Sequence, residues 1–198
     1  MLGGGPASGK STMLGSGKVD VPQGRAAAQI NADDIKGQLP EYNSMIQSGD
    51  PRAAQFSHEE SSYLAKEIQG RAFTNNQDIV LDGTGDSSKK SLTGKIETAR
   101  AYGYRVVGNY ATVPTQVAID RAMARGERTG RVVPESVIRE IHASVSQVFD
   151  KTASKFDEVK LWDNTGKSPV LLAQGGGGKL DIVNQAGYQA FLDKAGGN

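Results

Sequence analysis

A glycine-rich run near the N-terminus has the spacing of a phosphate-binding loop. Residues 4–11 match the pattern G-x-x-x-x-G-K-S/T without a mismatch. The glycines let backbone N–H groups turn around phosphate oxygens, Lys10 would reach the β- and γ-phosphates, and the Ser11 hydroxyl would be a ligand of Mg²⁺. The alternative is a flexible Gly/Ser loop that contains a lysine. The candidate nucleotide-binding residues are Gly4, Gly5, Pro6, Ala7, Ser8, Gly9, Lys10, Ser11 and Thr12.

A phosphate-binding loop normally follows a buried strand, and this chain has little room for one. Only Met1 and Leu2 precede Gly3. We therefore expect either that the first strand is nearly absent, truncated at the N-terminus, or that the chain begins inside a longer reading frame.

Two adjacent acids follow the segment 26–31, which we predict to be a strand. Asp33 and Asp34 would lie where this strand ends and a helix begins, at the sheet edge where ligands bind in open α/β folds. A carboxylate there can accept the proton of an attacking hydroxyl, as phosphoryl transfer requires. The spacing supports a second interpretation equally well, in which Asp33 caps the helix and Asp34 lies in its first turn.

A second strand end carries an acid and a hydroxyl. Residues 78–86 read DIVLDGTGD, so Asp82 and Thr84 would follow a buried strand, and the glycines beside them permit a ligand to come close. An ordinary strand-to-helix turn would use the same glycines. We favour a binding role because three such strand ends coincide.

A carboxylate interrupts the apolar pattern of the helix that we expect near residue 51. Glu60 occupies one step of an i+4 series otherwise made of Phe56, Leu64, Ile68 and Ala72. An acid on an apolar stripe must be paired, exposed or in contact with substrate. Glu60 and its neighbour His58 are therefore candidate substrate contacts. In the alternative interpretation, the helix leaves the core before Glu60.

Four of the ten arginines fall within eleven residues: Arg121, Arg125, Arg128 and Arg131. Arginine stabilises the charge that spreads over transferring phosphate oxygens, and a segment of this kind is suited to close over them. A solvated basic face is the usual alternative, and we expect it to describe one or two of the four.

Short runs rich in β-branched residues alternate with amphipathic helical patterns, which is typical of parallel strands joined by helices. The predicted strands cover 26–31, 78–82, 104–112 and 158–163, and the predicted helices 51–75, 87–102, 115–126 and 134–152. The last helix carries an apolar face formed by Val137, Ile138, Ile141, Val145, Val148 and Phe149.

After residue 168 we expect a hairpin with its turn at Gly175–Gly178 and a short final helix. The whole pattern predicts one α/β domain over residues 1–198. We expect a P-loop NTPase three-layer sandwich, with a mostly parallel central sheet flanked by helices.

Composition excludes several classes of protein. The 198 residues include 23 Lys+Arg, 22 Asp+Glu and no cysteine, so a thiolate nucleophile and a zinc ribbon are excluded. No apolar run approaches a membrane span, and the N-terminus lacks the regions of a signal peptide, which predicts a cytoplasmic protein with no membrane partner. A net charge of +1 and few aromatic residues (six Tyr, five Phe, one Trp) disfavour a nucleic-acid partner.

The motifs together resemble the zeta toxin family of P-loop kinases. The resemblance extends from GGPASGKST through INADDIK, HEESS, VLDGTGD and IDRAMARGERTGRVVP to the KLWDN strand. It implies a kinase that uses ATP and Mg²⁺ and phosphorylates a small molecule, UDP-N-acetylglucosamine in the best understood members. It also implies that Asp33 is the catalytic base, that Arg121 and Arg131 close on ATP, and that Asp82 and Thr84 contact the substrate. An antitoxin protein would be a partner in keeping with this family.

This sequence departs from the family at two positions in the DGTGD motif. Asp82 stands where the toxins usually carry Glu, and Asp86 stands where they carry a basic residue that helps to hold substrate. The charge reversal at Asp86 would weaken binding of an anionic diphosphate ligand, so the resemblance implies kinase activity more firmly than any one acceptor. Rival interpretations are a kinase of another substrate such as NAD, an ATP-hydrolysing switch or binding module, and an inactive fragment.

Overall fold

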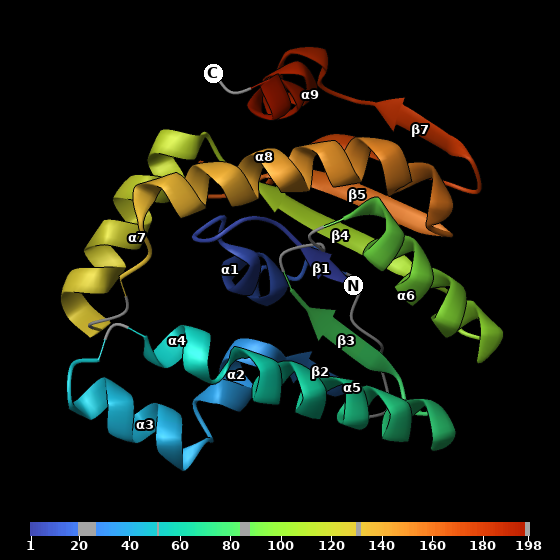
Figure 1. The fold of residues 1–198 in the computed structure, drawn as a ribbon. Coiled ribbons are helices and arrows are strands. Elements are labelled where there is room, and N and C mark those ends of the chain that lie inside the picture. The colour runs from blue at the N-terminus through green and yellow to red at the C-terminus, as the bar shows by residue number, and fades with distance from the viewer. Residues whose placement is uncertain (20–26, 51, 84–87, 130–131, 197–198) are drawn as a thin grey trace. The chain divides into compact units, whose positions relative to one another are not determined.

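A computed structural model describes residues 1–19, 27–50, 52–83, 88–129 and 132–196 (Figure 1). The chain forms two compact units. The P-loop unit comprises Met1–Asp20 and Thr84–Asn198, and the Asp33 unit comprises Val21–Gly83.

Five strands of the P-loop unit hydrogen-bond in the order β1-β4-β5-β6-β7. Strands β1 (Leu2–Gly3), β4 (Val107–Thr112) and β5 (Glu158–Asp163) are parallel. Strands β6 (Val170–Gly176) and β7 (Lys179–Ile182) continue the sheet in antiparallel fashion. The β4–β5 register places Thr112 opposite Asp163, so the two strands end side by side.

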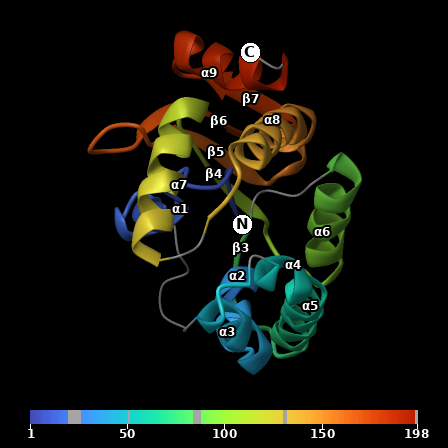
Figure 2. The same ribbon diagram turned by 60° about the vertical axis from the view of Figure 1, so that its left-hand side comes forward.

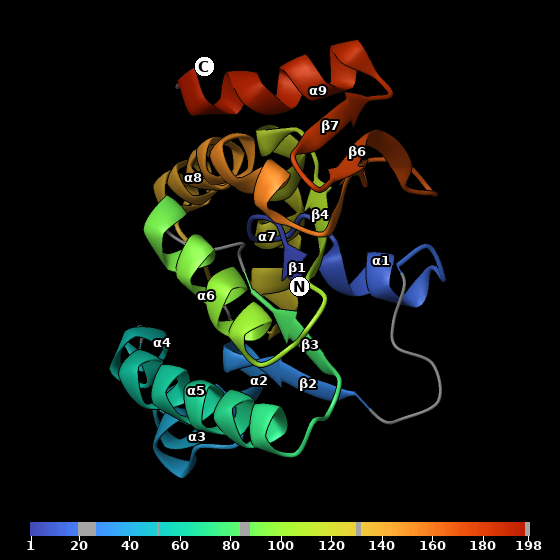
Figure 3. The ribbon, with the colours of Figure 1, turned by 90° about the vertical axis from the view of Figure 1, so that its right-hand side faces the viewer.

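Helices cover both faces of these strands. Figure 2 shows α1 (Lys10–Gly15) and α7 (Thr115–Thr129) on one side of the strands and α6 (Lys89–Ala101) and α8 (Glu135–Thr152) on the other. Helix α9 (Gln185–Leu192) packs against α8 and β6 and continues into the 3₁₀ turn η2 (Asp193–Gly196), while a second such turn, η1 (Ala153–Lys155), follows α8 (Figure 3).

Aromatic rings join α8 to the sheet in the core of the P-loop unit. Tyr110 of β4 is 1% exposed, and its ring centroid lies 4.9 Å from that of Phe149 and 6.1 Å from that of Phe156, both edge-on. The apolar face that we predicted for α8 is largely confirmed, because Ile138, Val145, Val148 and Phe149 are buried. Ile141 is half-buried and Val137 is exposed.

The Asp33 unit is built on two parallel strands, β2 (Ala28–Asn31) and β3 (Ile79–Asp82), paired from Ala28 opposite Ile79 to Asn31 opposite Asp82. Its helices are α2 (Ala32–Lys36), α3 (Pro40–Gln47), α4 (Ala53–Phe56) and α5 (His58–Thr74), and α5 packs on α2 and β2. Parallel pairing carries both strand ends to one edge of the pair, where Asn31 and Asp82 meet.

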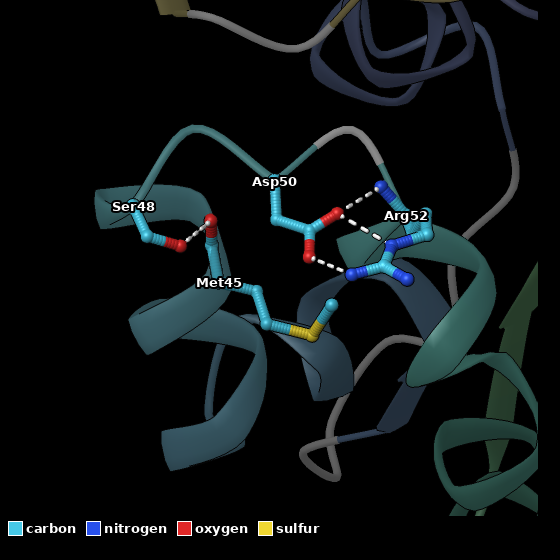
Figure 4. A network of polar contacts seen from close by, with 4 residues as sticks. All are labelled: Met45, Ser48, Asp50 and Arg52. Carbon is cyan, nitrogen blue, oxygen red and sulfur yellow. Dashed lines mark hydrogen bonds and ion pairs between the residues drawn. The ribbon is translucent and has the colours of Figure 1, made fainter.

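A small network of polar contacts follows the C-terminal end of α3 (Figure 4). The Ser48 hydroxyl donates to the Met45 carbonyl over 3.0 Å. The Asp50 carboxylate accepts two guanidinium N–H bonds and the backbone N–H of Arg52, over 2.7–3.0 Å. These bonds hold the pKa of Asp50 down at about 2.

The structure confirms the predicted strands, to within three residues at each end, corrects two other predictions and adds one helix that was not predicted. The helix predicted at 51–75 is two helices, α4 and α5, and α3 was not predicted. The predicted four-glycine turn is only two residues long, since Gly175 and Gly176 belong to β6 and Gly177 and Gly178 make the turn with positive φ. A Cβ on Gly176 would stand 2.1 Å from the Asp157 carbonyl oxygen, so the strand needs glycine there. In the described part of the chain, none of the helices has the length and hydropathy of a membrane span.

Candidate active site

The loop between β1 and α1 is folded by three residues with positive φ. These are Gly4 (+140°), Ala7 (+55°) and Gly9 (+82°), and Gly9 is also the N-cap of α1. Within the loop, Ser8 donates its backbone N–H to the Gly5 carbonyl over 3.3 Å. Left-handed residues such as Ala7 and Gly9 are typical of the tight loops whose backbone N–H groups form an anion-binding nest.

Lys10 begins α1, and its side chain folds back over the loop. Its Nζ donates to the Gly4 carbonyl over 3.0 Å, which places the ammonium across the mouth of the loop. Ser11 and Thr12 follow in the first turn of α1 and are exposed. A bound polyphosphate would therefore find the ammonium and these two hydroxyls beside the loop.

The loop is held from the end of β5 by Asn164, which is 5% exposed. Its Nδ2 donates to the Gly9 carbonyl over 2.9 Å and to the Ser8 carbonyl over 3.1 Å. These two bonds fix the peptide planes that contain the Ser8 and Gly9 carbonyls. The N–H groups lie on the other side of those planes, where a ligand would bind. A Cβ on Gly9 would lie 2.1 Å from Nδ2, so this contact requires glycine.

A second support comes from α8. His142 is buried, and its Nε2 lies 2.9 Å from the Pro6 carbonyl oxygen. Burial, with the nearby charges of Lys194 and Lys10, lowers the pKa of His142 to about 4. The imidazole is therefore neutral at physiological pH, and an Nε2–H tautomer can donate to Pro6. A Cβ on Gly5 would stand 2.4 Å from the imidazole, which explains glycine at that position as well.

Arg121 of α7 reaches the same corner of the site. Its guanidinium donates to the Asn164 carbonyl over 3.2–3.3 Å and to the Thr165 carbonyl over 3.0 Å. Its Nη1 lies 3.8 Å from the position that a Cβ on Gly9 would take. The structure thus brings Arg121 to the loop, as we predicted. Arg128 is exposed and bonds the Ala124 carbonyl of its own helix, and Arg131 lies outside the described residues.

The acids that we predicted as acceptor-side residues gather in the Asp33 unit. Asn31 caps α2, because its Oδ1 accepts the backbone N–H of Asp33 over 2.9 Å. Its Nδ2 donates to Asp82 over 3.2 Å, across the β2–β3 pair. The buried Lys36 pairs with the Asp33 carboxylate at 3.3 Å. The capping interpretation of Asp33 is therefore wrong: Asn31 makes the cap, and Asp33 and Asp34 both lie in the first turn.

His58 and Glu60 occupy the first turn of α5, and both are exposed. The predicted apolar stripe around Glu60 does not form, because Phe56 is 67% and Ile68 41% exposed and Phe56 belongs to α4. No burial penalty therefore constrains Glu60. Thr84 and Asp86 lie outside the described residues, so their predicted roles stay predictions.

Asn164 and His142 were not predicted as supports of the loop. His142 carried a signal, since it lies between Ile138 and Val145 on the apolar face of α8. Asn164 had only its place directly after a strand. Among the described residues, no three His, Cys, Asp or Glu side chains cluster as metal ligands. The exposed Ser11 hydroxyl, as a single protein ligand, suits Mg²⁺, which keeps most of its water and phosphate ligands.

Comparison with known proteins places this geometry in a family. The model of the family described as "Zeta toxin" matches residues 1–175. A search of curated proteins gave no match.

Solved structures share the fold. AvrRxo1-ORF1 in complex with AvrRxo1-ORF2 and sulphate ions has a TM-score of 0.71 at 20% identity, over 98% of this chain and 62% of that one. The corresponding complex with ATP has a TM-score of 0.71 at 19% identity, with the same coverage of both chains. A chain of the PezAT toxin–antitoxin system of Streptococcus pneumoniae has a TM-score of 0.64 at 16% identity, over 85% of this chain and 67% of that one. This chain therefore spans less than two thirds of the AvrRxo1 chains, and the likeness confirms the predicted α/β P-loop fold.

Proposed function

This chain belongs to the zeta toxin family, and on that premise we propose that it is an ATP-dependent small-molecule kinase. It would transfer the γ-phosphate of ATP to a hydroxyl of a nucleotide-like molecule, with UDP-N-acetylglucosamine as the first candidate acceptor. The proposal treats residues 1–198 as one kinase domain.

The observation that carries the proposal is the arrangement of Lys10 and Arg121 beside the loop. Lys10 bonds the Gly4 carbonyl, and Arg121 bonds the backbone carbonyl of Asn164, whose side-chain amide bonds Gly9. Two cations and a nest of backbone N–H groups suit a triphosphate, because phosphoryl transfer depends on positioning and on neutralising charge over the phosphate oxygens. The ATP complex of the similar AvrRxo1 structure supports ATP as the donor.

The reaction needs one proton transfer, for which Asp33 is the proposed base. Its carboxylate would take the proton of the acceptor hydroxyl while the hydroxyl oxygen bonds to the γ-phosphorus and the bond to the β–γ bridging oxygen breaks. ADP leaves with the electron pair of that bond. Lys36 pairs with the Asp33 carboxylate at 3.3 Å and would help to hold it in place.

Lys10, Arg121 and Arg131 would neutralise the charge that develops on the phosphate oxygens. Mg²⁺, which the Ser11 hydroxyl would hold, supplies a Lewis acid for those oxygens. Asp82 and Thr84, with His58 and Glu60, are the proposed contacts to the acceptor. The hydrogen bond between Asn31 and Asp82 would fix the orientation of the Asp82 carboxylate.

We further propose an antitoxin protein as partner and the cytoplasm, where ATP is abundant, as compartment. Two of the similar structures support the partner, because one is an AvrRxo1-ORF1:AvrRxo1-ORF2 complex and the other comes from a toxin–antitoxin system.

The test is acceptor-dependent turnover. The protein is incubated with ATP and Mg²⁺ and with separate members of a panel of nucleotide sugars and dinucleotides, NAD included, and products are read by mass spectrometry. We expect one acceptor to gain one phosphoryl group while ADP forms in equal amount. The matched variant Lys10→Ala should lose both products.

Other outcomes would contradict parts of the proposal. ADP and free phosphate formed without any acceptor would indicate an ATP-hydrolysing switch instead of a kinase. Unchanged turnover in Lys10→Ala would overturn the loop as the ATP site. Phosphorylation of NAD alone would keep the kinase and replace the acceptor.

A further inference from the structure

We propose that Lys194 is a positioning residue of the nucleotide site, acting on the loop through Thr112 and Asn164. The inference rests on the proposed ATP-dependent function and adds to it a residue from the C-terminal segment, beyond residues 1–175 that the family model matches.

Lys194 is bound at the carboxyl end of β4. It lies in η2, and its Nζ donates to the Thr112 hydroxyl and to the Val113 carbonyl, each over 2.5 Å. Thr112 is the last residue of β4, and both Thr112 and Val113 are buried. A charged side chain from the end of the chain thus occupies the strand end beside the phosphate-binding loop.

Thr112 connects this contact to the loop. Its backbone carbonyl accepts the N–H of Asn164 over 2.8 Å, and Asn164 in turn donates from Nδ2 to the Ser8 and Gly9 carbonyls. The preceding residue, Ala111, contacts the loop directly, since a Cβ on Gly4 would lie 2.4 Å from its carbonyl oxygen. One residue, Thr112, therefore lies between Lys194 and Asn164 in this chain of bonds.

The position of Lys194 is fixed by packing. The Ser146 hydroxyl of α8 donates to the Phe191 carbonyl over 2.6 Å, and the Phe191 ring lies edge-on to Phe149 with centroids 5.4 Å apart. The ammonium of Lys194 lies 5.7 Å from the centroid of the Phe191 ring. Helix α9 packs on α8 (Figure 3), and the following turn η2 carries Lys194, which bonds the end of β4.

The charge of Lys194 has little compensation at its hydrogen-bond acceptors, which are a hydroxyl and a carbonyl. Burial accordingly lowers the pKa of Lys194 to about 8, while the carboxylate of Asp163 on β5 acts in the opposite direction. His142 on α8 has a pKa of about 4 and is neutral wherever Lys194 titrates. The other cation that acts on His142 is Lys10 of α1. A bound triphosphate would supply negative charge that compensates the charge of Lys194.

The experiment measures ATP affinity by calorimetry, in the presence of Mg²⁺, between pH 7 and pH 9. We expect Lys194→Met to bind ATP about tenfold more weakly than wild type at pH 7, since the bonds of Lys194 to Thr112 and Val113 at the end of β4 are lost. Wild-type affinity should fall as pH rises through about 8, and this fall should disappear in Lys194→Arg, which keeps its charge. The control Lys179→Met removes an exposed lysine of β7 and should leave affinity unchanged.

Each outcome bears on one inference. If Lys194→Met loses thermal stability without nucleotide but keeps wild-type ATP affinity, or if wild type shows no fall near pH 8, the role of Lys194 is structural and our inference is wrong. If Lys194→Met fails to fold, two other measurements test the inference. Wild-type affinity should still fall near pH 8, and Thr112→Val, which removes one acceptor and keeps the lysine, should bind ATP more weakly than wild type. If wild type does not bind ATP, or Lys10→Ala binds it equally well, the proposed function itself fails.

Discussion

The side-chain amide of Asn164 lies 2.9 Å from the Gly9 carbonyl oxygen and would lie 2.1 Å from any Cβ placed on Gly9. The same contact therefore holds the loop and excludes every other residue at this position. Gly9 also has a φ of +82°, a conformation that L side chains rarely adopt. Sterics and backbone conformation together favour glycine at position 9.

We predict that Gly9→Ala abolishes tight ATP binding. The new Cβ must displace Asn164 and also strains the backbone, at a cost of about 1 kcal/mol from φ alone. ATP affinity should fall about tenfold or more, as measured by calorimetry. Gly15→Ala is the matched control, because Gly15 ends α1 and nothing lies within 4 Å of a Cβ there. It should bind ATP normally, and a Gly9→Ala variant that does the same would contradict the loop geometry.

A second prediction compares one substitution at two asparagines. In Asn164→Asp, a carboxylate replaces an amide donor that faces two carbonyls, so the free energy of unfolding should fall by about 1–3 kcal/mol and ATP affinity should drop. In Asn184→Asp, the cap of α9 keeps its acceptor for the Gly187 N–H, and stability should change little. Denaturant unfolding of both variants checks this. Equal effects would show that Asn164 has no special bond to the loop.

The loop could be read from the sequence because its chemistry is local. Gly4, Gly9, Lys10 and Ser11 stand at fixed offsets, and in the structure both glycines have a positive φ. The strands were also predictable, since β5 at Glu158–Asp163 is a continuous β-rich run bounded by turn formers.

The supports of the loop could not be predicted because they are contacts between distant parts of the chain. Asn164 reaches Ser8 over 156 positions, and His142 reaches Pro6 over 136. Which side chain lies behind the loop depends on the order β1-β4-β5, and a sequence pattern does not contain that order. The apolar stripe predicted around Glu60 failed for a related reason, because the chain turns at Ser57 between α4 and α5 and breaks the helical period.

The third prediction concerns pH and His142. Its pKa is lowered to about 4 in the folded protein, whereas an unperturbed histidine titrates near 6.5, so the unfolded chain binds more protons between these values. The contribution of the neutral imidazole to stability is therefore complete above about pH 6.5 and is lost as pH falls to about 4. The loss is on the order of 3 kcal/mol. Urea unfolding at pH 7 and pH 4.5 measures it, and His142→Gln should lose much of this pH dependence.

The histidine signals in an NMR titration provide an independent check on this prediction. The chain has two histidines, and His58 is exposed on α5. The signal of His142 should shift only near pH 4. A shift near pH 6.5 would show that the imidazole is solvated and does not support Pro6.

The fourth prediction separates Asp33 from its neighbour. Asp33→Asn should lower kcat roughly 10²–10⁴-fold, because an amide cannot accept the proton of the acceptor hydroxyl. ATP binding should persist, since the loop residues and Arg121 are unchanged.

Asp34→Asn is the matched control. Asp34 is exposed in the same first turn of α2, so both variants lose a similar interaction with the helix dipole, worth about 0.3–1 kcal/mol. Only Asp33→Asn also loses the 3.3 Å ion pair with Lys36. The variant Lys36→Met removes that pair and keeps the carboxylate, so it should retain far more turnover than Asp33→Asn. If Lys36→Met is as inactive as Asp33→Asn, the ion pair matters more than the base. If Asp34→Asn is the inactive variant, the catalytic carboxylate has been assigned to the wrong residue.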